Sequence, residues 1–441
     1  MMRQVGGSAP PVGIALGKAA FPAPFPGGLE YSAPARGVWN IVHAGMLVPQ
    51  AHEIYVCAQG CLRGVVLTAA EMGASARFST VTIEEHDLYD GDMESLLIEG
   101  VTDILQRLPM LPPAVLVYSS CVHHFMATDL ALCYRELRAR FPGVAFTDCY
   151  MNPIMRKSGL TPDQLMRRQL YSLLAPLEQD GGVNFVGSFY ALNRDSDLVQ
   201  LIAASGRPLR EITACKTYED YLQMARGSLN LITHPAAEPV GPYLQEKLGQ
   251  RYLYLPVAYR AAEIRQQQAQ LAQTLELPVN TPQLDAAQAQ AMQALDEARA
   301  CIGGAPIALD HTATMRPLAL VRLLVEAGFC VERLYCDSFA PLEAADFSWL
   351  QRHAPEITLL PTTAPRMRVE PRKSREKTLA IGQKAAYFTG SAYFVNLVEG
   401  GGLSGFAGIA HLAGRMREAF LHPKDTQRLI EQKGFGCGCC L

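Results

Sequence analysis

The feature that most constrains the fold of this chain is the regular alternation of short apolar runs with helical stretches. Residues 114–118 form an apolar run rich in valine, preceded by two prolines, which predicts a buried strand. Residues 129–141 have helical spacing and precede Pro142-Gly143, a pair that ends helices. A further strand is predicted at residues 144–147. This β-α-β order indicates parallel strands, because parallel neighbours need a crossover connection.

The same alternation begins again twice along the chain. It restarts at residues 183–187, and then at residues 307–309 after a helical segment rich in Gln and Ala, 261–300. Strands that alternate with helices form parallel sheets with helices on both faces. We therefore expect an α/β fold made of three Rossmann-like, doubly wound modules with parallel sheets.

Five segments are expected along the chain. Residues 1–37 are rich in Pro, Gly and Ala, and predict an irregular N-terminal arm that wraps a domain or a partner. The others are a first α/β module at 38–180, a second at 181–300, a third at 301–377, and a C-terminal segment at 378–441. This last segment is expected to pack back on the first module and to end in a cysteine-rich tail.

The amino-acid composition argues against a nucleic-acid-binding protein and against a membrane-spanning one. The formal net charge is −3 and 18% of the residues are charged, so no basic excess indicates a nucleic-acid partner. No run approaches the roughly 18 apolar residues of a membrane span, and Gly and Pro interrupt the N-terminal stretch where a signal peptide would be apolar. We expect a cytoplasmic protein. Its 12 cysteines would stay reduced there, as buried residues or as metal ligands.

Two cysteine motifs carry the candidate chemistry. Cys57 and Cys61 are four residues apart around Gly60, with Gly64 following. Thiolates in such a pair suit iron–sulfur clusters and zinc alike, although two semi-buried structural cysteines are the more common explanation of this motif alone. Glycines at these positions permit positive φ or the close approach of another group.

The second motif is Ser119-Ser120-Cys121-Val122-His123-His124, which follows the predicted strand at 114–118. It therefore falls at the carboxyl end of a parallel sheet, where α/β proteins place their sites. The alternative is that Cys121 is a small core residue and that the two histidines cap the next helix.

Together these motifs resemble the nitrogenase component 1 family. That family includes the large subunits of nitrogenase, light-independent protochlorophyllide reductase, the reductive cyclase of nickel tetrapyrrole synthesis and methylthio-alkane reductase. Its second cluster cysteine lies in a Gln-Gly-Cys or Val-Gly-Cys sequence, as in Gln59-Gly60-Cys61. Its third lies in a Ser/Thr-rich motif after a strand with an acidic residue downstream, as in Ser119-Ser120-Cys121 with Asp129. Residues 405–408, Gly-Phe-Ala-Gly, resemble a Gly-Tyr-acidic-Gly element of the family.

The resemblance implies an iron–sulfur cluster, [4Fe–4S] or larger and similar to the nitrogenase P-cluster, with Cys61 and Cys121 among its ligands. It also implies two kinds of partner. One is an ATP-dependent iron protein of the nitrogenase reductase type. The other is a second subunit, either another copy in a homodimer or a paralogue, because the family holds its cluster at a subunit interface.

The chain departs from the family pattern at the first cluster cysteine. That residue is expected near residues 28–36, where the sequence offers Ser32 and no cysteine. Cys57 could replace it, because on one helical turn its Cβ would lie ~5–6 Å from that of Cys61. Alternatively, Cys57 continues an apolar run into a strand and is an inert core residue. Ser32 and Cys149, which ends a predicted strand, are secondary ligand candidates.

The ligand pair of the nitrogenase active-site cofactor is not preserved. Its cysteine follows a Leu-Asn-aliphatic strand, but here Leu229–Ile232 lead to Thr233-His234. Its histidine precedes the Gly-Tyr element, where this chain has Ser404. Dinitrogen is therefore not the expected substrate. His234 could face a different substrate or simply cap the strand end before Pro235, and His123 and His124 are further catalytic candidates.

The favoured hypothesis is a subunit of a nitrogenase-like oxidoreductase that receives electrons from the iron protein and reduces a bound substrate. Two alternatives remain open. One is a scaffold for cluster assembly without turnover, and the other is a zinc-bound or metal-free α/β binding protein. The tail thiols Cys437, Cys439 and Cys440 could bind a soft metal or dock on a partner, although chain ends are usually mobile.

Overall fold

The computed structural model describes residues 12–35, 41–151, 159–372 and 377–426. The chain divides into two compact units. Unit 1 comprises Met1–Val38, Ala258–Gln267 and Val279–Leu441, and unit 2 comprises Trp39–Val257 and Gln268–Pro278. The expected tail ligands Cys437, Cys439 and Cys440 lie outside the described residues.

Unit 2 contains two sheets in which all strands are parallel. The first has the order β3-β2-β4-β5. Its strands are β2 (His52–Ala58), β3 (Phe78–Ile83), β4 (Ala114–Ser120) and β5 (Ala145–Met151). Its helices are α1 (Ile41–Gly45), α2 (Gln59–Glu71), α3 (Glu85–Asp90), α4 (Met93–Arg107), α5 (Cys121–Phe125), α6 (Leu130–Arg140) and α7 (Pro162–Gln169).

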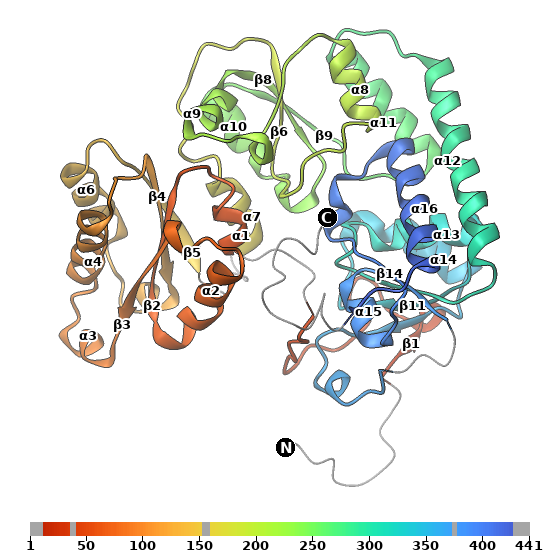
Figure 1. Cartoon of the computed structure of the whole chain (residues 1–441), viewed down its shortest axis with the longest axis horizontal. Coiled ribbons are helices and arrows are strands. Elements are labelled where there is room, and N and C mark those ends of the chain that lie inside the picture. The colour runs from red at the N-terminus through yellow and green to blue at the C-terminus, as the bar shows by residue number, and fades with distance from the viewer. Residues whose placement is uncertain (1–11, 36–40, 152–158, 373–376, 427–441) are drawn as a thin grey trace. The chain divides into compact units, whose positions relative to one another are not determined.

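Alternating side chains of the first sheet enter two apolar layers, one on each face. Ile54 and Val56 pack with α4 and α6, whereas Tyr55 and Cys57 pack with α1 and α2. Figure 1 shows α4 and α6 on one side of this sheet and α1 and α2 on the other. Helices therefore cover both faces, which explains why its strands are apolar nearly throughout.

The second sheet of unit 2 repeats this arrangement in the order β7-β6-β8-β9. Its strands are β6 (Gly182–Phe185), β7 (Leu209–Glu211), β8 (Gly227–Ile232) and β9 (Arg251–Tyr254), and its helices are α8 (Asp197–Ala204), α9 (Tyr218–Leu222) and α10 (Val240–Leu248). Leu271 from the second half of α11 (Ala261–Thr274) also enters its core. In both sheets the strand order reverses between the first and third strands, a switch point where ligands bind in open α/β sheets.

Unit 1 contains a six-stranded sheet of order β1-β12-β11-β10-β13-β14. Its strands are β1 (Ile14–Ala15), β10 (Ile307–Asp310), β11 (Val331–Tyr335), β12 (Thr358–Leu360), β13 (Leu379–Ile381) and β14 (Phe394–Val395). Five strands are parallel, and β1 pairs antiparallel with β12. Its helices are α12 (Thr281–Ile302), α13 (Pro317–Glu326), α14 (Ala344–His353), α15 (Gln383–Thr389) and α16 (Gly405–Leu421). The three sheets establish the expected α/β class.

Two terminal segments complete the third sheet. In the N-terminal segment, Ile14 pairs with Leu359, and Tyr31 packs on the core beside β13 and α15, so the described part of this arm wraps the third sheet. In the C-terminal segment, Ala380 pairs with Ala308 of β10 and with Phe394. These pairings put β13 and β14 in the third sheet, and the packing of this segment on the first module stays a prediction. A short apolar strand fits any parallel edge, so its partner could not be derived from its own residues.

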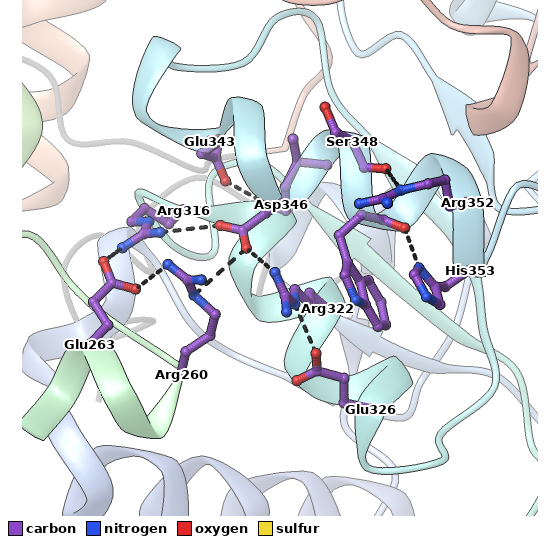
Figure 2. Close-up of polar contacts among 12 residues, drawn as sticks. Arg260, Glu263, Arg316, Arg322, Glu326, Glu343, Asp346, Ser348, Arg352 and His353 are labelled. Carbon is purple, nitrogen blue, oxygen red and sulfur yellow. Dashed lines mark hydrogen bonds and ion pairs between the residues drawn. The ribbon is translucent and has the colours of Figure 1, made fainter.

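A buried cluster of charges joins three helices of unit 1, and Figure 2 shows it. Asp346 of α14 is 1% exposed and forms ion pairs with Arg316 (3.1 Å) and Arg322 (3.3 Å). Arg316 also pairs with Glu263 in the first turn of α11. Glu343 accepts a hydrogen bond from the backbone N–H of Leu318 in α13 (2.8 Å). Each of these buried charges therefore has its partner within the chain.

Candidate functional site

Cys61 and Cys121 lie at the carboxyl edge of the first sheet, on either side of its switch point. Strands β2 and β4 are neighbours, with Val56 opposite Ser119. Helix α2 begins directly after β2 with Cys61 as its third residue, and α5 begins directly after β4 with Cys121 as its first. Because parallel strands end at the same edge, the two thiols are brought to one place by rigid elements. This placement agrees with the prediction for the Ser-Ser-Cys motif.

Cys57 occupies a different kind of position. It lies in β2, which continues to Ala58, and it is fully buried on the same face as Tyr55. Burial, and then the nearby Cys61 and Cys121 thiols, raise the pKa of the Cys57 thiol to about 12. The Cys61 and Cys121 thiols are therefore both close enough to Cys57 to disfavour its thiolate, which would need a compensating charge.

The helical-turn geometry predicted for Cys57 and Cys61 is wrong. The prediction assumed that the strand ends at Cys57 because Gly60 follows it, but Gly60 is the second residue of α2 and β2 extends past Cys57. The two thiols belong to a strand and to the helix after it. A ligand role for Cys57 remains a prediction, now based on its proximity to the other thiols.

Cys61 lies on the exposed part of α2 between two exposed glycines, Gly60 and Gly64, with Gln59 and Arg63 also exposed. Cys61 is exposed, and a Cβ added to Gly60 or Gly64 would meet no atom within 4 Å. Neither glycine has positive φ. Glycine inside a helix is less favourable than alanine by ~0.8–1.0 kcal/mol, so packing and backbone geometry within the described residues give no reason for these two. They are suited to the close approach of a bound group or of another chain.

The two histidines after Cys121 differ in environment. His124 is exposed, whereas His123 is 2% exposed. His123 Nδ1 accepts a hydrogen bond from the backbone N–H of Ser120 (3.2 Å), and this contact forms part of a capping box at the start of α5. Burial lowers the pKa of His123, so the neutral imidazole is favoured. The proposed capping role is present for His123.

The remaining candidates are separated from this edge or already engaged. Ser32 is exposed and belongs to unit 1. Cys149 is buried in β5 beside Tyr118, and burial raises the pKa of its thiol well above the usual range. His234 follows β8, and its Nδ1 accepts a hydrogen bond from the N–H of Ala236 (3.0 Å), which is the capping alternative. Ser404 stands at the N-cap of α16.

The donor set at this edge fits a sulfur-ligated group that the described residues do not complete by themselves. Among the residues that the structure describes, no group of three or more His, Cys, Asp or Glu side chains is arranged to hold a metal ion. Two accessible thiols, one buried thiol and open glycines nevertheless match soft-metal or cluster chemistry, which prefers thiolate ligands. The missing ligands would have to come from outside the described residues.

The sequence analysis noticed both glycines but missed what distinguishes His123. Its Nε2 atom is buried and has no hydrogen-bond partner among the described residues. The spacing Ser120-x-x-His123 at a helix start fits the capping contact that the sequence analysis gave as an alternative. Whether Nε2 has a hydrogen-bond partner depends on residues from distant parts of the chain. A local sequence pattern does not predict those neighbours.

Comparison with known families settles the relationship of this chain. The model for nitrogenase component 1 type oxidoreductases matches residues 42–419. The chain belongs to this family. As a component 1-type protein it is related to nitrogenase-like oxidoreductase subunits, which supports a redox role at the coarse level.

Solved structures agree with the family assignment. A structure described as nitrogenase Cp1 at pH 6.5 shares 13% identity at a TM-score of 0.65, covering 89% of this chain and 93% of that one. A second, described as nitrogenase Cp1 at pH 5, shares 14% identity at a TM-score of 0.58, covering 92% and 94%. At such identities the likeness establishes the fold alone. No curated protein matches the chain. Within the described residues, no helix is both long and apolar enough to span a bilayer.

Proposed function

We propose that this component 1-type protein is a cytoplasmic redox subunit that receives electrons from an ATP-dependent iron protein and reduces a bound substrate other than dinitrogen. The observation that carries the proposal is the placement of Cys61 and Cys121 at one sheet edge, across a switch point. Family membership supports the oxidoreductase role.

Cys61 and Cys121 would hold an iron–sulfur cluster, [4Fe–4S] or larger, with Cys57 as the third thiolate. When bound, such a cluster supplies one-electron storage at low potential. The chain's own contribution is placement: the starts of α2 and α5 fix two sulfur atoms relative to each other. The buried Cys57 would lose its proton only on ligation. Burial disfavours the charged thiolate, and a bound metal ion would supply the compensating positive charge.

A second subunit, either another copy of this chain or a paralogue, would complete the ligand set. Cys61 is exposed, and the open glycines Gly60 and Gly64 leave room for another backbone to approach. A shared cluster explains why the described residues bring together thiols without closing a metal site.

The substrate is proposed to differ from dinitrogen because the nitrogenase cofactor ligands are absent. His234 already caps the segment after β8, and Ser404 occupies the N-cap position of α16, where the family cofactor histidine would precede the Gly-Tyr element. No substrate is assigned to His123, His124 or His234.

The decisive test is anaerobic purification with reconstitution, followed by iron and acid-labile sulfide analysis. We expect a brown protein whose iron is lost in Cys61→Ser and Cys121→Ser. Cys330→Ser is the matched control, because Cys330 is exposed and lies in unit 1. Zinc without sulfide would indicate the binding-protein alternative. A cluster that passes to an acceptor protein, without electron uptake from an iron protein, would indicate the assembly scaffold.

Two further measurements sharpen the proposal. Cys57→Ala and Cys57→Ser should both lower iron per chain and alter the electron paramagnetic resonance spectrum of the reduced protein. Unchanged iron and an unchanged spectrum in both variants would make Cys57 structural. Light scattering should show a dimer or larger assembly, and a monomer with a full, stable cluster would contradict the shared site.

A further inference from the structure

Acidic residues are concentrated in one part of the first module. Residues 78–134 contain nine Asp and Glu residues but only one Lys or Arg, although the whole chain has nearly as many basic residues (39) as acidic ones (42). Seven of the nine acids fall in two segments without Lys or Arg, residues 84–94 and 124–129. They are Glu84, Glu85, Asp87, Asp90, Asp92, Glu94 and Asp129. Negative charge is therefore segregated in a chain whose formal net charge is only −3.

The two segments form one surface, which we call the α3 surface (residues 84–94 and 124–129). The backbone N–H of Asp129 donates a hydrogen bond to Glu94 Oε1 at 2.6 Å, so the segments are in contact. The first segment holds α3 and the start of α4, and the second holds the end of α5 and the turn before α6. Helices α3 and α5 follow the parallel strands β3 and β4, so both segments lie at the carboxyl edge of the first sheet.

The α3 surface lies beside the two candidate ligands at this edge. Ile83, the last residue of β3, pairs with Ala58, the last residue of β2, and α2 with Cys61 begins directly afterwards. On α5, Phe125 follows Cys121 by four residues, which places both on the same side of that helix. A molecule bound to the α3 surface would therefore lie close to both thiols.

The acids of the α3 surface have no Lys or Arg partners. Within the described residues none of the seven forms an ion pair with either, and only the exposed His86 contacts two of them. Asp92 and Asp129 are the N-caps of α4 and α6, which accounts for their positions. Asp90 has no such role, because it is the last residue of α3, the helix end at which negative charge is unfavourable. The surface thus keeps an uncompensated negative charge.

Large apolar side chains stand among these charges. Tyr89 is 81% exposed and Phe125 is 70% exposed, and Leu88 and Met126 are exposed as well. Exposed apolar patches with a polar rim mark interaction sites, and aromatic residues are enriched in protein interfaces. The α3 surface therefore combines apolar contact residues with charge of a single sign.

A buried polar atom near the same surface also lacks a partner. His123 is 2% exposed, its Nδ1 accepts the backbone N–H of Ser120, and its Nε2 has no hydrogen-bond partner among the described residues. Burial lowers the pKa of His123, whereas Ser120 and Glu94 act in the opposite direction, so Glu94 of the α3 surface is close to the ring. Because buried polar atoms are almost always paired, this one indicates that a further molecule completes the surface.

The charge of the α3 surface indicates what kind of molecule binds it. The cores of permanent subunit interfaces are depleted in charged residues. A second copy of this chain, related by a two-fold axis, would place acids against acids, and like charges across an interface are costly. Transient redox encounters instead use small surfaces, and complementary charge speeds their formation. The α3 surface therefore fits a transient partner with a basic face.

We propose that the α3 surface docks the electron donor, a redox protein whose own docking face is basic around an apolar centre. The inference rests on the proposed function, in which the group at Cys61 and Cys121 receives electrons. In each encounter one electron leaves the donor, which is oxidised, and enters that group, which is reduced, and no bond forms or breaks. The second subunit would then take the face of α2 that carries Gly60 and Gly64.

The test measures electron uptake by the reconstituted protein from a reduced iron protein of the nitrogenase reductase type, with ATP, at about 20 mM and about 300 mM salt. The charge-reversal variant is Glu85→Lys with Asp90→Lys, because neither residue is a helix N-cap. The matched control is Glu238→Lys with Glu246→Lys, which makes the same change of charge at exposed acids of the same unit. Reduction by dithionite, which needs no docking, and light scattering accompany each measurement.

At the lower salt concentration we expect the charge-reversal variant to take up electrons from the iron protein about tenfold more slowly than the wild type, because it loses electrostatic steering. The difference should shrink at the higher concentration, where salt screens the charges. Tyr89→Ser with Phe125→Ser should slow uptake at both concentrations, because salt does not screen apolar contact. Dithionite reduction, iron per chain and the mass of the assembly should stay unchanged in every variant.

Three outcomes would overturn the inference and leave the proposed function standing. Unchanged uptake from the iron protein in the charge-reversal variant would show that the acids do not guide docking. Slower dithionite reduction would show that they act on the bound group. A lower assembly mass would place the α3 surface in the subunit interface. A wild-type protein that dithionite reduces and the iron protein does not would instead defeat the donor of the proposed function, and this inference with it.

Discussion

The charged cluster of unit 1 and the thiol edge of unit 2 are both rich in polar or reactive side chains, but they differ in what surrounds those side chains: the charges of the cluster form ion pairs with one another, although Arg316 Nε has no hydrogen-bond partner among the described residues. Asp346 is buried among three arginines, with Arg260 at 4.0 Å in addition to Arg316 and Arg322. At the thiol edge, His123 Nε2 is buried without a hydrogen-bond partner among the described residues, and Cys61 is exposed.

The difference separates a structural polar cluster from a functional one. Buried charges that form ion pairs with one another hold helices together, and removing one leaves the others without their partner in an apolar environment. A site that leaves donors and thiols open does little for the folded chain by itself and is built for something that binds later. The two regions should therefore respond oppositely to mutation.

The largest expected effect is on the charged cluster. Asp346→Ala leaves Arg316, whose side chain is 3% exposed, without its buried partner, so we expect a loss of ~3–5 kcal/mol in the free energy of unfolding. Urea unfolding of the metal-free protein measures it. Asp103→Ala is the control, because its ion pair with Arg107 is exposed. A loss similar to that of the control would show that the cluster is not structural.

The next effect is a pH dependence centred on Glu343. Burial raises the pKa of Glu343 from 4.5 to about 7, against the opposing effects of the Leu318 N–H and Arg316. Between these values the folded chain binds the proton more tightly than the unfolded chain, so this group's contribution to stability falls as pH rises. At about 1.4 kcal/mol per pKa unit, this rise in pKa corresponds to a loss of roughly 3 kcal/mol in the free energy of unfolding as pH rises.

Glu343→Gln should reduce the loss of unfolding free energy that accompanies rising pH. Urea unfolding at about pH 5 and pH 8 compares the variant with the wild type, and Glu326→Gln, on the more exposed end of α13, is the control. A pH dependence that is the same in all three proteins would refute the assignment to Glu343.

A smaller effect, of opposite sign, is expected at the thiol edge. Gly60→Ala and Gly64→Ala should each stabilise the metal-free chain by ~1 kcal/mol, because an added Cβ has open space and alanine favours helices. Gly414→Ala in α16 is the control, since that glycine is also open. Only the α2 variants should weaken subunit association in light scattering. Equal association in all three variants would remove the argument for a partner at α2.

The smallest effect on folding is expected for Cys61 itself. Cys61→Ser changes an exposed side chain, so the metal-free unfolding free energy should stay within about 0.5 kcal/mol of wild type. The same variant is expected to lose its iron. A large destabilisation without metal would place Cys61 among the structural residues, as at Asp346.

The sequence by itself determined the class of fold and the place of one thiol, Cys121. The apolar run at 114–118 became β4, and the helical spacing at 129–141 became α6. A motif directly after a parallel strand must lie at the carboxyl edge of its sheet, so the position of Cys121 followed from local pattern alone. The family resemblance could be read from the same short motifs.

Tertiary structure alone decided which residues are neighbours and which atoms stay unpaired. The pairing of β13 with β10, the burial of Cys57 beside Tyr55, and the open space at Gly60 depend on segments far apart in the chain. The buried Nε2 of His123, which has no hydrogen-bond partner among the described residues, is of the same kind, because a missing partner is a property of everything that surrounds an atom. The periodicity of apolar residues predicts which face of a helix or strand is buried. Only the packing of the whole chain determines which residues contact that face.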